Sequence, residues 1–186
     1  MFDFKNNNKI IFIPGWLDSG QRHGFCRSLE LWGGLVNFNQ DLKTDYVIAH
    51  SLGALAALSN WQKYRNLRII LINPVISRKG IIKRWLRFNK YEGVPQSLRA
   101  GIRLLPLLLS FITIIKLFRV PALAIIKQMA PAQLFILRGE KDIYLADREF
   151  MMTLKERGFT VEQIDGAGHN YSHDFEKKIK EYIHLD

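Results

Sequence analysis

Residues 46–56, with the sequence YVIAHSLGALA, pass from an apolar strand through a short turn directly into a helix. The turn places Ser51 between two small residues, Ala49 two positions before it and Gly53 two positions after it. Side chains at those two positions crowd each other when a strand turns sharply into a helix, so both must be small. Such a turn holds its central residue in a strained conformation and projects the hydroxyl away from the sheet. We therefore expect Ser51 to be presented at the end of a strand.

Five short apolar runs, rich in β-branched and aromatic residues, predict buried strands. They cover residues 9–13, 45–49, 67–72, 133–137 and 159–164. Helical patterns cover residues 25–35, the segment after Ser51, 145–157 and 172–184. Buried strands separated by helices are typical of a mostly parallel sheet with helices on both faces. Right-handed crossovers bring the carboxyl ends of such strands to one edge, where open α/β sheets bind their ligands.

One insertion, from about residue 75 to 130, breaks this alternation between the third and fourth strands of a single domain, 1–186. Apart from Glu92 the insertion has no acidic residue. The rest of the chain contains 16 acidic and 16 basic residues, which balance. The formal net charge of +10 therefore resides in the insertion. Its basic residues are Arg78, Lys79, Lys83, Arg84, Arg87, Lys90, Arg99, Arg103, Lys116, Arg119 and Lys127.

The same insertion contains the most hydrophobic run of the chain, residues 104–115. The run is shorter than the ~20 residues that span a bilayer, so we expect a buried or interfacial helix. Basic residues interleaved with aliphatic ones, without a recognised nucleic-acid motif, argue against nucleic acid as a partner. The partners expected for the basic side are an acidic carrier protein or an anionic membrane surface.

The amino-terminal residues and the cysteine content bear on location. Residues 1–9 lack the apolar core of a signal peptide, so we expect a cytoplasmic protein, peripheral at the membrane if the insertion docks there. Cys26 is the only cysteine, which excludes an internal disulfide and a cysteine-rich zinc cluster. It fits a buried small hydrophobic position.

Two later loops offer the partners that a nucleophilic serine needs. A serine hydroxyl is a weak nucleophile unless a base removes its proton, and the base needs an acid to orient it. Asp142 closes the sequence RGEKD (138–142) after the fourth strand, and His169 closes GAGH (166–169) after the fifth. Both follow strands, so we expect them at the same edge of the sheet as Ser51.

Other residues compete for these roles. Asp147 lies in a predicted helix, and Asp165 fits the turn before the histidine loop. His173 is the alternative base, although it is expected on the first turn of the last helix. His50 adjoins Ser51 but faces the opposite way, which predicts a packed or cavity-lining side chain.

Together these motifs resemble the α/β-hydrolase superfamily, in particular its small serine esterases and lipases. That family has Gly-x-Ser-x-Gly at the nucleophile, where this chain has Ala49 as the first small residue. Residues 139–142 look like its Gly-x-x-Asp acid loop, and residues 166–169 look like its Gly-x-Gly-His loop. The resemblance implies an α/β-hydrolase fold with a shortened, mostly parallel sheet and a helical cap formed by the insertion.

The resemblance also implies how the site works. The oxyanion hole would use the backbone N–H of Leu52 and that of Trp16, with Leu17 as the alternative donor. The implied activity is that of a serine hydrolase that cleaves carboxylic esters or thioesters through an acyl-enzyme, without metal or cofactor. Its substrate would be a small-molecule or carrier-linked acyl ester. The alternative is a non-catalytic protein of the same fold that binds an acidic partner or an anionic membrane through the insertion.

Overall fold

The computed structural model describes residues 9–16, 18, 23–25, 44–61, 67–77, 80–91, 104–145 and 148–183. Five strands form one sheet in the order β1-β2-β3-β4-β5, and every neighbouring pair is parallel. The strands are β1 (Ile10–Ile13), β2 (Tyr46–His50), β3 (Arg68–Ile72), β4 (Leu134–Gly139) and β5 (Thr160–Ile164). All five predicted strands are confirmed, and their carboxyl ends share one edge because they run in the same direction. The predicted helix over 25–35 and Cys26 fall outside the described residues, except for Phe25.

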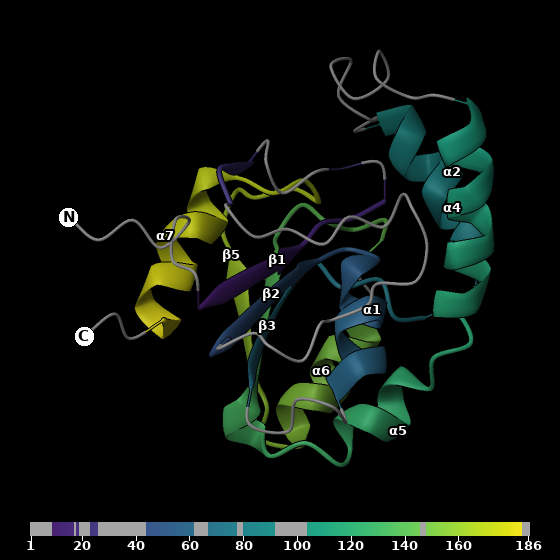
Figure 1. Cartoon of the computed structure of the whole chain (residues 1–186). Helices are drawn as coiled ribbons and strands as arrows, with labels where there is room; N and C mark the ends of the chain where they lie inside the picture. The colour runs from purple at the N-terminus through teal and green to yellow at the C-terminus, as the bar shows by residue number, and fades with distance from the viewer. Residues whose placement is uncertain are drawn as a thin grey trace.

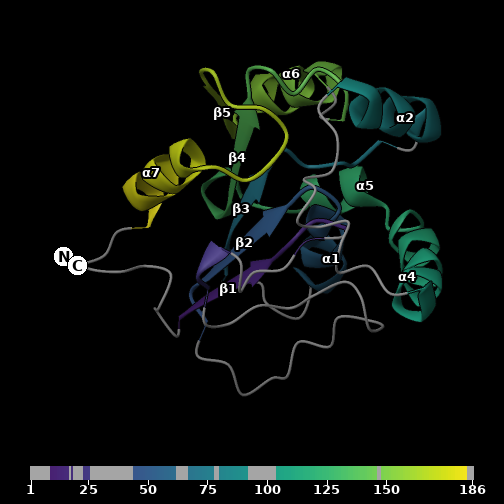
Figure 2. The same ribbon diagram turned by 90° about the horizontal axis from the view of Figure 1, so that it is seen from above.

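Helices cover both faces of the sheet, as the apolar strands require (Figure 2). On one face lies α7 (His173–Tyr182), which packs Phe175 and Ile179 against the side chains of Ile10 and Phe12. The alternate residues of β1, Ile11 and Ile13, point to the other face. That face is covered by α1 (Gly53–Asn60) and α6 (Arg148–Glu156), and α5 (Ala122–Ile126) packs beside α1.

The described part of the insertion between β3 and β4 is mostly helical. It contains α2 (Ile81–Tyr91), α4 (Leu104–Leu117) and α5, followed by the 3₁₀ turn η4 (Pro131–Gln133) that leads into β4. The apolar run over 104–115 thus forms one helix, as predicted. In Figure 1, α2 and α4 lie at the end of the molecule opposite α7. Among the described residues, no helix has both the length and the apolar character needed to cross a membrane.

Polar and aromatic contacts fasten α2 to the segment that follows β4. The guanidinium of Arg84 donates from Nε to the carbonyl oxygen of Tyr144 (2.9 Å) and from Nη2 to that of Leu145. At the end of α2, the ring of Tyr91 stacks on the ring of Tyr144, with 5.6 Å between their centroids. The insertion is therefore connected directly to the loop that contains Asp142.

Candidate active site

Ser51 occupies a strained turn between β2 and α1. Its φ is +54°, a left-handed conformation that non-glycine residues rarely adopt. The surrounding backbone holds it there, because the Ser51 N–H donates to the carbonyl oxygen of Ile72 (2.9 Å) and the Ser51 carbonyl accepts from the N–H of Val75 (3.2 Å). The structure thus has the sharp turn that the sequence predicts, with the serine at the carboxyl edge of the sheet.

The small residues of the turn are explained by close backbone packing. A Cβ atom at Gly53 would lie 2.4 Å from the carbonyl oxygen of Ile13 and 2.6 Å from that of Pro14. No side chain fits there, so glycine lets the first turn of α1 approach the end of β1. Ala49 is completely buried on the strand before the turn, in the close-packed interior.

Three side chains from three separate loops meet at this edge. His169 Nε2 lies 2.9 Å from Ser51 Oγ, and His169 Nδ1 lies 2.7 Å from Asp142 Oδ2. The carboxylate accepts a hydrogen bond, so it fixes the tautomer of the neutral imidazole with the proton on Nδ1. Nε2 is then left as the acceptor for the Ser51 hydroxyl. The structure therefore brings together the three residues that the sequence singled out.

Burial and backbone contacts hold Asp142 in place. The side chain of Asp142 is fully buried, and those of His169 and Ser51 are nearly so. Asp142 Oδ1 accepts from the N–H of Leu145 (3.1 Å), while Arg138 Nη2 donates to the Asp142 carbonyl oxygen (2.9 Å). Each oxygen of the Asp142 carboxylate thus has its own donor: the Leu145 N–H for Oδ1 and the His169 Nδ1–H for Oδ2.

Sequence reasoning missed Asn73, which joins the two loops. It follows β3 with a φ of +44° and is fully buried. Its Nδ2 donates to the carbonyl oxygens of Gly168 and His169, each at 2.8 Å, and its Oδ1 accepts from the N–H of Gly139 at 2.7 Å. Before Pro74, asparagine looks like an ordinary strand terminator, so only its place at the carboxyl edge of the sheet could have indicated this role.

The loop after β1 adjoins the serine. A Cβ atom at Gly15 would lie 3.0 Å from Ser51 Cβ and 3.5 Å from Ser51 Oγ, so the backbone passes close to the serine and a side chain here would press on it. Trp16, the next residue, lines the cavity above Ser51, and so does Leu52. Leu17, the alternative donor for an oxyanion, is outside the described residues.

An apolar cavity of about 340 Å³ lies above Ser51. Trp16 contacts α2 and α4 of the insertion, with ring-centroid distances of 5.8 Å to Trp85 and 5.4 Å to Phe111. The ring of Phe88 meets the His169 imidazole edge to face at 5.2 Å. The insertion supplies most of the apolar wall: Ile81, Ile82, Trp85 and Phe88 from α2, Phe111 and Ile114 from α4, and Phe118 just after it.

His50 lies beside the serine and lines the same cavity, as the sequence predicts. Its Nε2 is 2.7 Å from the carbonyl oxygen of His169, so Nε2–H donates that bond. Burial, reinforced by the neighbouring His169, lowers the pKa of His50 to about 4. His50 is therefore neutral at pH 7 and holds the backbone of His169 without adding a charge to the cavity.

The competing residues lie elsewhere or cannot be placed. The side chain of His173 is 83% exposed on the first turn of α7, with Nδ1 3.8 Å from Glu176 Oε2. Asp165 is exposed in the turn after β5, and Asp147 is outside the described residues. Within the described part of the chain, no three or more His, Cys, Asp or Glu side chains are grouped so as to hold a metal ion.

Comparisons with known proteins identify the fold. No family model and no curated protein matches the sequence. The structure is similar to E-2-(acetamidomethylene)succinate hydrolase (TM-score 0.60, 15% identity, 94% of this chain and 90% of that one). It is also similar to N-formylmaleamic acid deformylase of Pseudomonas putida (0.55, 12%, 94% and 92%). A third similar structure is a carboxylesterase of Nitrososphaera gargenis (0.51, 15%, 93% and 86%). The chain has a shortened α/β-hydrolase fold, which confirms the resemblance at the level of the fold.

Proposed function

We propose that this protein is a serine hydrolase that cleaves carboxylic esters or thioesters through an acyl-enzyme intermediate. The observation that carries the proposal is the continuous hydrogen-bonded chain from Ser51 Oγ through His169 to Asp142. A nucleophile, a base and an orienting carboxylate in this order are what acyl transfer at a serine requires. Fold alone would not support a reaction, because one fold hosts many chemistries. The solved structures that are similar to this chain are mostly hydrolases, which agrees with the proposal.

In the acylation step, Ser51 Oγ attacks the acyl carbon while its proton passes to His169 Nε2. The carbon–oxygen double bond opens to a tetrahedral oxyanion, and the imidazolium is stabilised by Asp142. When the tetrahedral intermediate collapses, the bond to the leaving alcohol or thiol breaks. The leaving group takes the proton from Nε2, and the acyl group remains esterified to Ser51.

In the deacylation step, water replaces the leaving group. His169 Nε2 removes a proton from the water as its oxygen attacks the acyl carbon, which gives a second tetrahedral oxyanion. When this intermediate collapses, the bond between the acyl carbon and Ser51 Oγ breaks, Oγ takes the proton from Nε2, and the carboxylic acid leaves. We assign stabilisation of both oxyanions to the backbone N–H groups of Leu52 and Trp16. This assignment is supported by the position of Leu52 at the start of α1 and by the close approach of the Gly15 backbone to Ser51.

We assign the acyl part of the substrate to the cavity. Its wall is made of aromatic and aliphatic side chains, which favour a hydrocarbon chain over a polar group. In this proposal the insertion acts as a cap, because α2 and α4 supply the wall above Ser51. A cavity of about 340 Å³ lies within the usual range for small-molecule sites, so a short to medium acyl chain fits it.

The test is hydrolysis of nitrophenyl esters of increasing acyl length by the purified protein. The proposal predicts turnover that increases from acetate to medium-length chains, because longer chains fill the apolar cavity, and that is lost in Ser51→Ala. The matched control is Ser59→Ala on α1, whose exposed hydroxyl donates to the carbonyl of Ala56 and which should retain wild-type turnover. A well-folded wild type without turnover on esters and thioesters would favour the non-catalytic alternative.

A further inference from the structure

The outer sides of α2 and α4 combine exposed aliphatic side chains with cations. Ile82 is 73% exposed and Leu86 58% exposed on α2, while Ile112 and Ile115 are more than half exposed on α4. The same outer sides present exposed basic residues. We call these residues together the α2–α4 surface: Ile82, Lys83, Leu86, Arg87 and Lys90 on α2, and Ile112, Ile115 and Lys116 on α4.

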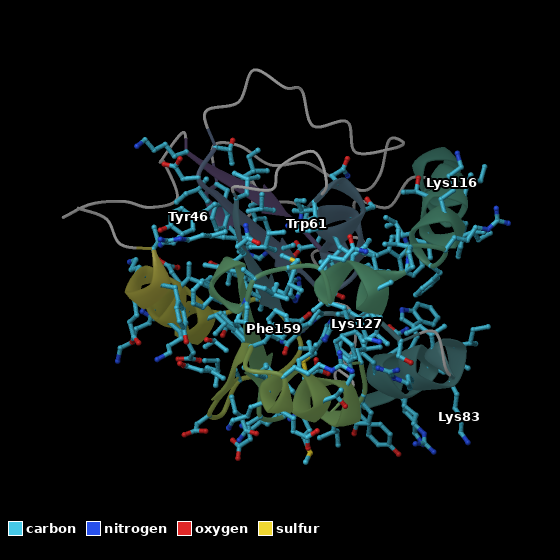
Figure 3. The ribbon with its side chains drawn as sticks, turned by 90° about the horizontal axis from the view of Figure 1, so that it is seen from below. Tyr46, Trp61, Lys83, Lys116, Lys127 and Phe159 are labelled. Carbon is cyan, nitrogen blue, oxygen red and sulfur yellow. The ribbon has the colours of Figure 1, made fainter. Side chains whose placement is uncertain are left out.

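The spacing on each helix gathers these residues on one side of that helix. On α2 the aliphatic pair Ile82 and Leu86 is one turn apart and adjoins Lys83 and Arg87, which are also one turn apart. α4 repeats the arrangement, with Ile112 and Ile115 next to Lys116. Figure 3 shows Lys116 at the upper right and Lys83 at the lower right, both on the side of the molecule away from the yellow α7. The described part of the insertion contains no acidic residue that would offset these charges.

The α2–α4 surface is connected to the cavity above Ser51. Ile81 and Ile82 line that cavity, and they also line a second hollow on the outer side of α2. The described lining of this outer hollow is completed by Lys83, Leu86, Arg87 and Lys90, besides Gly80. The outer hollow and the cavity above Ser51 therefore adjoin the same two side chains, those of Ile81 and Ile82.

We propose that the α2–α4 surface docks this protein on an anionic lipid bilayer. Aliphatic side chains on amphipathic helices insert at the boundary between headgroups and acyl chains, while the neighbouring cations contact anionic headgroups. An acidic protein would need an apolar patch beside its acidic residues to cover the four exposed aliphatic side chains, whereas an anionic bilayer supplies both the charge and the hydrocarbon. Resting on the function proposed above, the inference adds that the substrate is a lipid acyl ester that enters the cavity past Ile82.

The experiment measures co-sedimentation of the full-length Ser51→Ala protein with vesicles, so that docking is tested separately from hydrolysis. We expect binding to vesicles of phosphatidylcholine with phosphatidylglycerol, weaker binding at high salt, and little binding to phosphatidylcholine alone. Lys83→Gln with Arg87→Gln should lower the partition coefficient by roughly 25-fold, about fivefold for each charge. Leu86→Ser with Ile115→Ser should weaken binding at every salt concentration.

The matched control removes two charges from the opposite side of the molecule. Lys177→Gln with Lys180→Gln changes α7, which lies across the sheet from the insertion (Figure 2), and should leave vesicle binding unchanged. In protein that keeps Ser51, the Lys83 and Arg87 substitutions should also leave hydrolysis of a short soluble ester unchanged, since neither side chain lines the cavity. Equal losses in the α2 and α7 variants, or binding to an acidic acyl carrier protein but not to anionic vesicles, would overturn the proposal.

Discussion

Asn73 holds the backbone of His169 from a different strand of the sheet. The Asn73 Nδ2 donates to the carbonyl oxygen of His169 at 2.8 Å, although the two residues are 96 positions apart in the chain. The same side chain accepts from the N–H of Gly139, at the end of the strand that leads to Asp142. One buried amide thus sets the distance between the loop of the base and the loop of the acid.

Asn73→Asp is therefore predicted to impair both stability and turnover. The substitution keeps an acceptor for the Gly139 N–H but replaces both donated bonds with an oxygen that faces the carbonyls of Gly168 and His169. Leaving buried carbonyls without donors should lower the free energy of unfolding by about 2 kcal/mol. Displacement of His169 should lower kcat by about 10²-fold with little change in KM.

Asn60→Asp is the control for this substitution. Asn60 Nδ2 also donates to a backbone carbonyl, that of Ala56, but its side chain is only partly buried at the end of α1. Urea unfolding and ester kinetics of both variants test the prediction. If Asn73→Asp changes stability and kcat no more than Asn60→Asp does, then Asn73 does not position the histidine loop.

His169 and His173 give a direct test of which histidine is the base. His169→Ala should lower kcat by about 10⁴-fold, because it removes the acceptor of the serine proton. His173→Ala should leave kcat unchanged, since its exposed side chain lies on α7 near Glu176. Ester kinetics of both variants check this, and the reverse order of effects would show that the base is wrongly assigned.

Asp142→Asn is predicted to lower kcat by about 10⁴-fold without unfolding the protein. The amide has nearly the same shape, so Oδ1 can still accept from the N–H of Leu145. An amide nitrogen in the position of Oδ2 would, however, donate to His169 Nδ1 and favour the tautomer with the proton on Nε2. Activity that survives this substitution, measured beside an unchanged circular dichroism spectrum, would exclude Asp142 as the orienting acid.

His50 predicts how stability depends on pH. Its pKa is about 4 in the folded protein and has the ordinary value of 6.5 when the chain unfolds. As pH falls from 6.5 towards 4, the unfolded chain binds a proton here that the folded chain does not. His50 then lowers the free energy of unfolding by up to about 1.4 kcal/mol per pH unit, and it has no effect above this range.

The comparison for this prediction is His50→Gln, which can keep a donor near the His169 carbonyl but does not titrate. Urea unfolding of both proteins at several values between pH 4.5 and pH 7.5 measures the slope. The wild type should lose stability more steeply than the variant below pH 6.5, and their slopes should agree above it. Parallel curves over the whole range would mean that His50 is not held neutral by burial.

Much of the fold and of the candidate site could be predicted because each signal was local. A small residue on each side of Ser51 already limits the backbone to a sharp turn, and apolar runs of strand length mark the sheet. The loops of Asp142 and His169 follow predicted strands, and parallel strands bring such loops to one edge whatever their separation in the chain. These inferences need no knowledge of how distant helices pack.

The rest depended on packing, which a single sequence does not specify. Asn73 acts through two backbone carbonyls of a loop 96 residues away, and an asparagine before a proline carries no sign of that. Residues 81–91 were expected only as part of a helical cap, without bounds of their own, so nothing indicated that Phe88 would face His169 while Leu86 would face outwards. The cavity above Ser51 was likewise not predictable in shape, because its wall joins two inserted helices with the loop after β1.

The central claim is that Ser51 is a nucleophile activated by His169, and labelling with a fluorophosphonate followed by intact mass measurement tests it most directly. The account predicts that the folded wild type gains one phosphonyl group, and that Ser51→Ala and the heat-denatured wild type gain none. It also predicts that His169→Ala is labelled far more slowly, since the hydroxyl then has no base. A folded wild type that stays unlabelled, or Ser51→Ala labelled as fast as wild type, would contradict the account.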